Sequence, residues 1–116
     1  MVRRVLIKCD GKVFFVREQD IVFVEAAGHY AYVSLGSVTL FTKTSLARLE
    51  SRLNKERFVR LHRSAIVNLD QIGHLQPQGT EYLLTLKGGK QLKASRKHVS
   101  RLLKTLRVDS QEDDVA

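Results

Sequence analysis

Residues 60–70, reading RLHRSAIVNLD, begin with a dense group of side chains that could recognise a ligand. Their first half places Arg60, His62 and Arg63 within four positions, which concentrates positive charge and hydrogen-bond donors. Their second half is apolar and is typical of a buried anchor. In an alternating strand, His62 and Arg63 point to opposite sides. We assign His62 to inward support and Arg63 to contact, because an arginine fork can grip O6 and N7 of guanine.

Basic residues are segregated along the whole sequence. The net charge is +8, but four of the twelve acidic residues lie in the last eight positions and all twenty Lys and Arg precede them, so residues 1–108 carry +12. Residues 87–108 contain eight cations and no acid. This pattern predicts a polyanionic partner, and nucleic acid is favoured over a membrane because no helix pairs a basic face with an aromatic insertion face. The alternative is a solvated basic surface that serves solubility.

The histidines, the cysteine and the carboxylates do not have the spacing of a metal site or a catalytic site. The four histidines, His29, His62, His74 and His98, have none of the short spacings of a metal site, and the single Cys9 gives neither a thiolate pair nor an internal disulfide. No nucleophile elbow, glycine-rich phosphate loop or pair of acid/base carboxylates is present. We therefore expect no enzyme activity, no metal and no cofactor.

Turn signals predict that strands position these side chains. Asp10-Gly11, Gly36-Ser37 and Gly88-Gly89 predict hairpins that pair residues 5–9 with 12–16, 29–35 with 38–42, and 81–87 with 90–94. A further strand at 21–26 precedes a loop at Ala27-Gly28, and Pro77-Gln78-Gly79 predicts a fourth turn. His29 is then expected to project from an inter-strand loop, the alternative being a strand-end residue packed against the core.

Two helices are expected, each with a serine cap. Ser45 can begin a short helix, and Ser95 can begin a longer one that closes the core. The apolar positions of the longer helix are Val99, Leu102, Leu103 and Leu106. Its N-terminus presents free N–H groups and a positive dipole end beside Arg96 and Lys97, which suits phosphate.

The elements together predict one mainly β domain over residues 1–108, followed by an acidic tail at 109–116 that we expect to be disordered. No apolar run is long enough to span a membrane and the N-terminus lacks the features of a signal peptide, so a cytoplasmic protein is expected. Tyr30, Tyr32 and Phe41 are expected to fill a sheet interface rather than form a stacking surface.

Phe58 to Asn68 closely resembles the Phe-x-Arg-x-His-Arg-Ser-x-x-Val-Asn motif of the LytTR family of bacterial DNA-binding domains. The likeness extends through DIVFVEA at 20–26, the His29-Tyr30 loop, a Leu-x-x-Leu helix at 46–49 and ASRKHVSRL at 94–102. The resemblance implies an elongated multi-sheet β fold with two short helices. It also implies a transcriptional regulator of the response-regulator type, whose loops and a helix N-terminus enter major grooves of a direct-repeat promoter element.

The resemblance implies double-stranded DNA as the partner. Because the sequence shows no long apolar edge or heptad seam, we expect the isolated domain to be monomeric and to pair only on DNA. DNA contacts are predicted at His29, Arg60, Arg63, Arg96 and Lys97. The receiver or sensor domain that usually accompanies this family is not in this chain, and the sequence leaves open whether the regulator stands alone. Two other functions stay open: an RNA or single-strand module that uses Tyr30, Tyr32 and the basic patch, and a protein-interaction domain for an acidic partner.

Overall fold

Three antiparallel sheets stand side by side in the computed structural model, which describes residues 2–106. The tail at 109–116 lies outside the described residues. The strands are β1 (Arg4–Cys9), β2 (Lys12–Arg17), β3 (Phe23–Ala27), β4 (Tyr30–Ser34), β5 (Thr39–Thr42), β6 (Phe58–His62), β7 (Ala65–Asn68), β8 (Ile72–Gln78), β9 (Glu81–Leu86) and β10 (Gln91–Ser95). The helices are α1 (Leu46–Arg52) and α2 (Arg96–Thr105), with 3-10 turns η1 (Glu18–Asp20) and η2 (Leu69–Gln71).

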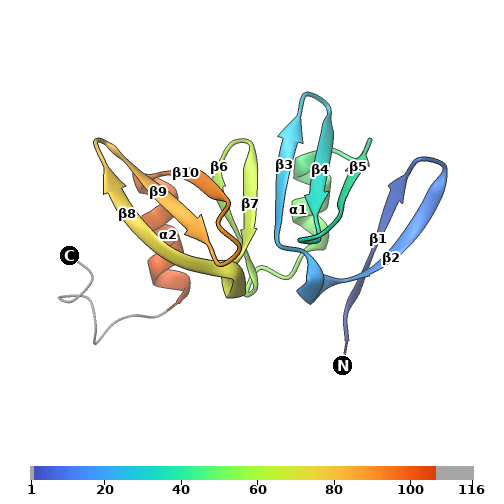
Figure 1. Cartoon of the computed structure of the whole chain (residues 1–116), viewed down its shortest axis with the longest axis horizontal. Coiled ribbons are helices and arrows are strands. Elements are labelled where there is room, and N and C mark those ends of the chain that lie inside the picture. The colour runs from blue at the N-terminus through green and yellow to red at the C-terminus, as the bar shows by residue number, and fades with distance from the viewer. Residues whose placement is uncertain (1, 107–116) are drawn as a thin grey trace.

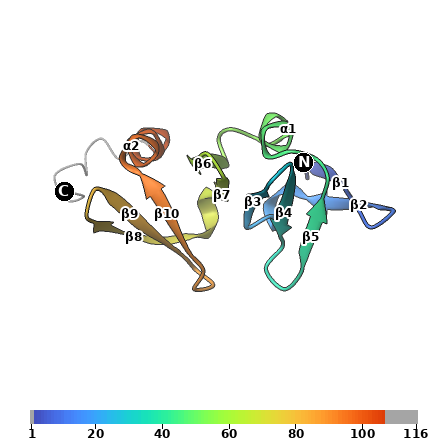
Figure 2. The ribbon, with the colours of Figure 1, turned by 90° about the horizontal axis from the view of Figure 1, so that it is seen from above.

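The sheets follow one another along the molecule (Figure 1). β1 and β2 form a separate hairpin, the central sheet has the order β5-β4-β3-β7-β6, and the third sheet has the order β10-β9-β8. Both α-helices lie on the same side of this row (Figure 2). The predicted mainly β, multi-sheet fold with two short helices is confirmed.

The hairpins predicted from turn signals are all present, and the first two have the expected registers. In the third, Thr85 pairs with Gln91 and the N–H of Leu86 donates to the carbonyl of Lys90, so Lys87 joins the turn and the register is shifted by one residue from the prediction. Asp10 and Gly11 both have positive φ (52° and 75°), which suits a two-residue turn between right-twisted strands. β4 pairs with β5 and β9 pairs with β10, as predicted around the other two glycine turns. The fourth turn was misplaced: β8 continues through Pro77 to Gln78, and the turn lies at Gly79-Thr80. Proline is tolerated there because β8 is an edge strand, where an N–H can be spared.

A hairpin that the turn signals did not predict lies inside residues 60–70. β6 ends at His62, Arg63 and Ser64 form the turn, and β7 begins at Ala65. The register shifts between Arg60 and His62, which marks a bulge beside the turn. The basic and apolar halves of this segment therefore belong to two different strands.

Two hydrophobic cores meet at this hairpin. Ile66 packs in the core shared with the N-terminal half and α1, whereas its neighbours Ala65 and Val67 pack in the core beneath α2. All four residues of β7 are buried, so both faces of the strand are covered. This burial explains the uninterrupted apolar run and fixes the β6–β7 turn near the middle of the molecule.

Both predicted helices begin at their serines. The Oγ of Ser45 accepts a hydrogen bond from the backbone N–H of Arg48 (3.3 Å), and the Oγ of Ser95 accepts one from the N–H of His98 (3.2 Å). Leu102 is buried, but Leu106 follows the end of α2 and is 49% exposed, so its assignment to the core-facing stripe is wrong. No helix within residues 2–106 is long and apolar enough to cross a membrane.

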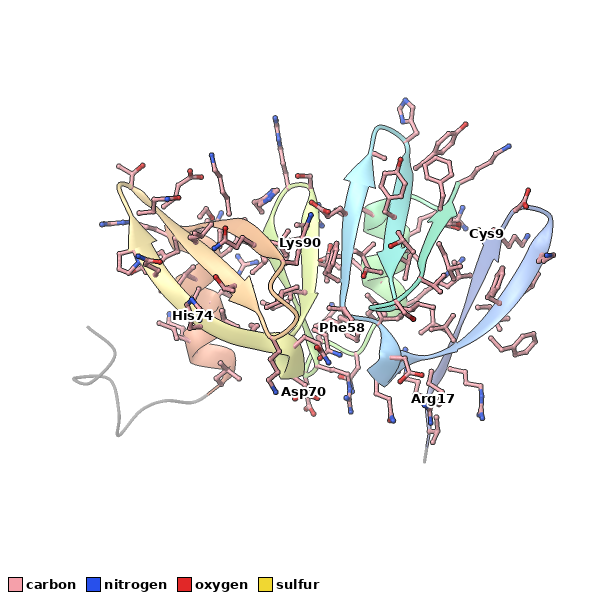
Figure 3. All side chains as sticks on the ribbon, viewed as in Figure 1. Cys9, Arg17, Phe58, Asp70, His74 and Lys90 are labelled. Atoms are coloured by element: carbon pink, nitrogen blue, oxygen red, sulfur yellow. The ribbon has the colours of Figure 1, made fainter. Side chains whose placement is uncertain are left out.

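A lysine side chain adds a charged contact between the third sheet and the central sheet. Lys90 follows the β9–β10 turn, and its Nζ lies 3.6 Å from the Glu25 carboxylate on β3 and 5.4 Å from the centre of the Phe23 ring (Figure 3). This contact joins neighbouring sheets across a boundary without strand pairing.

Candidate nucleic-acid interface

Three segments that are far apart in the sequence lie along one edge of the molecule (Figure 1). They are the β3–β4 turn (Gly28-His29), the β6–β7 turn (Arg63-Ser64) and the first turn of α2 with Arg96 and Lys97. We call this the upper edge, after its place in Figure 1. It brings together four of the five residues predicted to contact DNA.

His29 occupies the second position of a tight hairpin turn. Gly28 has a φ of 64°, a conformation that suits glycine, and the chain then re-enters β4 at Tyr30. The side chain of His29 is exposed. The alternative in which His29 packs against the core is therefore wrong, and its ring nitrogens are open to a ligand.

The aromatic residues beside His29 are also exposed. Tyr30, Tyr32 and Phe41 are 39%, 44% and 39% exposed on the outer face of β4 and β5, so the expectation that they fill a sheet interface is wrong. They pack on one another instead: the ring centres of Tyr30 and Phe41 are 5.1 Å apart, and those of Tyr32 and Phe41 are 5.0 Å apart. The reason is that they alternate with Ala31, Val33 and Leu40, which point to the other side of the sheet and are buried in the core that includes α1.

Arg60 holds the β6–β7 turn from within. Its Nε donates to the carbonyl of His62 (2.9 Å), and one terminal nitrogen donates to the carbonyl of Arg63 (2.6 Å). The other terminal nitrogen binds the carboxylate of Glu50 on α1. The guanidinium predicted to contact DNA is thus already engaged by three protein groups, and it fixes the turn to α1.

His62 completes the support of this turn. Its Nδ1 accepts a hydrogen bond from the backbone N–H of Ser64 (3.1 Å) and lies 2.9 Å from the Ser64 Oγ. His62 and Ser64 are half-buried, whereas Arg63 between them is exposed. Arg63 is therefore the side chain that this turn presents to solvent.

The start of α2 adds cations and a helix dipole. Its first turn holds no acid, and Arg96 and Lys97 are exposed. Neither they nor Arg63 have an ion-pair partner among residues 2–106. Free charge and the positive end of the helix therefore coincide.

The environment of His98 shows that the start of α2 and the end of β6 lie close together. It is half-buried, and its Nδ1 lies 2.6 Å from the Ser95 Oγ. Burial lowers the pKa of His98 below its ordinary 6.5, and so does repulsion from Arg101, Lys97, Arg60 and His62. Groups from α2 and from β6 thus act on one imidazole, which is neutral at pH 7 in a strongly positive setting.

Neutralised charge gathers on the opposite edge. Arg17 and Asp70 lie there (Figure 3). Arg17 pairs with Asp20 at 2.9 Å, and Arg57 pairs with Asp70 at 3.0 Å. Arg63, Arg96 and Lys97 on the upper edge differ from these two cations, since they have no ion-pair partner among residues 2–106. Within the described part of the chain, no three His, Cys, Asp or Glu residues gather as a metal site would require.

Sequence reasoning did not identify the supporting contacts of Arg60 or the pairing of Ser95 with His98. The second had a local signal, since a serine cap and a histidine three positions later lie on the same turn. The first had none, because Glu50 lies ten positions away on another element.

Known proteins place this arrangement in a family. The model of the LytTr DNA-binding domain family matches residues 11–107. The sensory transduction protein LytT of Bacillus anthracis is 32% identical over 100 residues, which cover 85% of this chain and 41% of that protein. The CO-responsive transcriptional regulator RcoM of Rhodospirillum rubrum is 35% identical over 75 residues, or 65% of this chain and 32% of that protein.

A solved structure agrees with these matches. The LytTr DNA-binding domain of a Bacillus cereus response regulator superimposes with a TM-score of 0.77 at 30% identity, covering 90% of this chain and 96% of that one. The chain spans about two fifths of the length of the LytT proteins that it matches. Because the family model matches residues 11–107 and the solved domain has the same fold, the chain belongs to the LytTR family of DNA-binding domains.

Proposed function

We propose that this domain binds duplex DNA sequence-specifically through the upper edge, as the DNA-binding part of a bacterial transcriptional regulator. The observation that carries the proposal is the convergence of His29, Arg63 and Lys97 on one edge. All three side chains are exposed and come from separate elements. Family membership supports DNA as the ligand.

In the proposed complex, turns and a helix end enter successive major grooves of a direct-repeat promoter element. Arg63 grips O6 and N7 of a guanine, and His29 bonds a base edge from the β3–β4 turn. Arg96 and Lys97 bind a base edge or a phosphate at the start of α2. Arg60 and His62 act as positioning residues, because a turn fixed before binding loses less conformational freedom on the DNA.

The exposed aromatic residues favour one competing function. Tyr30, Tyr32 and Phe41 stand beside His29 and could stack the bases of RNA or a DNA single strand. Their rings already pack on one another, which leaves less face for a base. We therefore rank this function second.

Competition separates the two functions. A duplex selected from a random pool, its separated strands and a structured RNA are titrated by fluorescence anisotropy at the same salt concentration. The proposal expects the selected duplex to bind tightest. Tighter binding of a single strand or RNA than of any duplex would overturn it.

The domain is expected to be monomeric without DNA and to pair on the repeats of its site. Sedimentation of the free domain as a dimer at low micromolar concentration would contradict the monomer. No cofactor takes part in this scheme.

Since the LytT relatives are longer than this chain, we also propose that it serves as the effector part of a larger regulator.

A further inference from the structure

We propose that a basic groove between the β1–β2 hairpin and the β5–α1 segment binds phosphates of the same duplex beyond the β3–β4 turn. The inference rests on the proposed function and extends it by a second contact surface. The upper part of the groove is lined by four cations that come from both of its sides: Lys8, Lys12, Lys43 and Arg48.

The groove continues along the molecule. A second hollow, lined by Arg4 and Arg52, shares Lys8 and Arg48 with the first. Lys8 and Lys12 flank the Asp10-Gly11 turn, whereas Lys43 and Arg48 follow β5. Residues more than thirty positions apart in the sequence thus line one positively charged groove.

The four cations of the upper part of the groove are not neutralised within the part of the chain that the structure describes. Lys8, Lys12, Lys43 and Arg48 are exposed and have no ion-pair partner there. Asp10, at the tip of the hairpin, is the only acidic residue among the lining residues. Like charges held this close repel one another, so an anionic ligand relieves the repulsion when it binds.

The groove adjoins the upper edge. β4 and β5 pair with Ala31 opposite Thr42, so Lys43 follows beside Tyr30, the residue after His29. Neighbouring strands are about 4.8 Å apart, and successive nucleotides rise about 3.4 Å along each DNA strand. The tip of the β1–β2 hairpin points to the same side (Figure 1). A DNA strand that meets His29 would therefore pass Lys43 within one or two nucleotides and then reach Lys12.

An acidic protein segment is the competing ligand. Leu6 and Val13 line the lower hollow and would suit the apolar side of such a segment. The upper part favours phosphate, because it combines four long cationic side chains with direct continuity to the proposed DNA edge. We therefore assign the upper part to the DNA backbone.

The test uses the double variant Lys12→Ala/Lys43→Ala. It is titrated with three duplexes that contain the same selected site: a short one, one extended by about six base pairs at one end, and one extended by about six base pairs at the other end. Each lost phosphate contact should lower affinity roughly fivefold at 0.15 M salt, so the double variant should lose about 25-fold on one extended duplex. The slope of log K against log salt should become shallower by about 2. The short duplex and the preference over random sequence should change little.

Lys87→Ala is the matched control. Lys87 is an exposed lysine without an ion-pair partner among residues 2–106, and it lies in the β9–β10 turn, away from the upper edge (Figure 1). It should leave all three affinities unchanged. Melting curves of each variant should match the parent, since the truncated side chains are exposed.

The outcomes separate the two proposals. If the parent domain binds the selected duplex and depends on Arg63, but the double variant binds every duplex like the parent, the groove does not hold DNA and the groove assignment is wrong while the proposed function stands. If the parent prefers single strands to any duplex, the proposed function fails and the groove assignment fails with it.

Discussion

At the scale of single residues, the β6–β7 turn is held by side chains rather than by turn chemistry. Arg63 and Ser64 include none of the glycine, proline or asparagine that commonly fix a tight turn. Arg60 and His62 replace that preference with hydrogen bonds to the turn's own backbone. The position next to Ser64 is then free to be a long cation.

Alanine at Arg63 or Lys97 should weaken binding to a selected duplex by about 1 to 3 kcal/mol each if the side chain contacts a base. Binding to random duplex should change much less, and the melting temperature should stay the same because both side chains are exposed. The measurement is the ratio of selected to random affinity for each variant. Lys104→Ala, exposed in the last turn of α2, is the control and should weaken both duplexes slightly and equally.

If Arg63→Ala and Lys97→Ala both remain folded and keep the parent ratio, these residues bind only phosphates. The assignment of base contacts to them would then be wrong, while duplex binding itself would stand.

His98 should make the stability of the free domain depend on pH. Its pKa in the folded state lies below 6.5 because of burial and the surrounding cations, so the folded protein binds fewer protons there than the unfolded chain does. The stabilising contribution is present above pH 6.5 and is lost as pH falls from 6.5 through the lower folded pKa.

The measurement is the free energy of unfolding in urea between pH 7.5 and 5, for the parent and for His98→Gln. The variant should lose less stability than the parent as pH falls. His74→Gln, at an exposed histidine on β8, is the control (Figure 3). Equal pH dependence in the parent and in His98→Gln would contradict the assignment.

At the scale of elements, the two helices have matching caps and different tasks. Ser45 and Ser95 each accept a hydrogen bond from the N–H three residues later. The first turn of α2 carries Arg96 and Lys97 of the upper edge, whereas the first turn of α1 carries Arg48 of the proposed phosphate groove. Comparing the loss of each cap can therefore distinguish an effect on stability from an effect on the position of the α2 N-terminus on DNA.

Ser95→Ala and Ser45→Ala should each lower the free energy of unfolding by about 1 kcal/mol, the usual effect of losing an N-cap. Ser95→Ala should also lower the ratio of selected to random affinity, because the first turn of α2 frays and Lys97 is no longer held in place. Ser45→Ala should leave that ratio unchanged. If the two variants have the same effect on the ratio, the position of the α2 N-terminus does not matter for recognition.

At the scale of the whole molecule, two cores share one hairpin. Phe58 and Ile66 face the core on the α1 side, whereas Val59, Leu61 and Val67 face the core beneath α2. The β6–β7 turn is therefore anchored from both sides. Such anchoring keeps the three segments of the upper edge at fixed separations.

The segregation of charge should make affinity strongly dependent on salt. If the domain neutralises roughly six phosphates, log K should fall against log salt with a slope near −5. Titrations of the selected duplex between 50 and 300 mM salt give the slope. A slope near zero would remove the electrostatic basis of the proposal, whereas a random duplex should show a similar slope at lower affinity.

The sequence alone determined the hairpins at Asp10-Gly11 and Gly36-Ser37, both helix starts and the family. It could do so because turn conformations and caps are made by residues close together in the chain. The basic character of residues 87–108 and the motif around Arg63 also needed no structure. These features place His29 on a loop and Lys97 at a helix start, but they place Arg63 in a strand and do not put the three residues beside one another.

Only the tertiary structure decided which cations are free. Arg60 is engaged because Glu50, on another element, lies against it, and no local pattern encodes that contact. Pro77 could remain in a strand because β8 lies at a sheet edge, and strand order is a property of the whole fold. Lys12 and Lys43 line one groove because the β1–β2 hairpin lies beside the central sheet. Contacts between distant segments follow from how the sheets pack, so neither spacing nor composition could predict them.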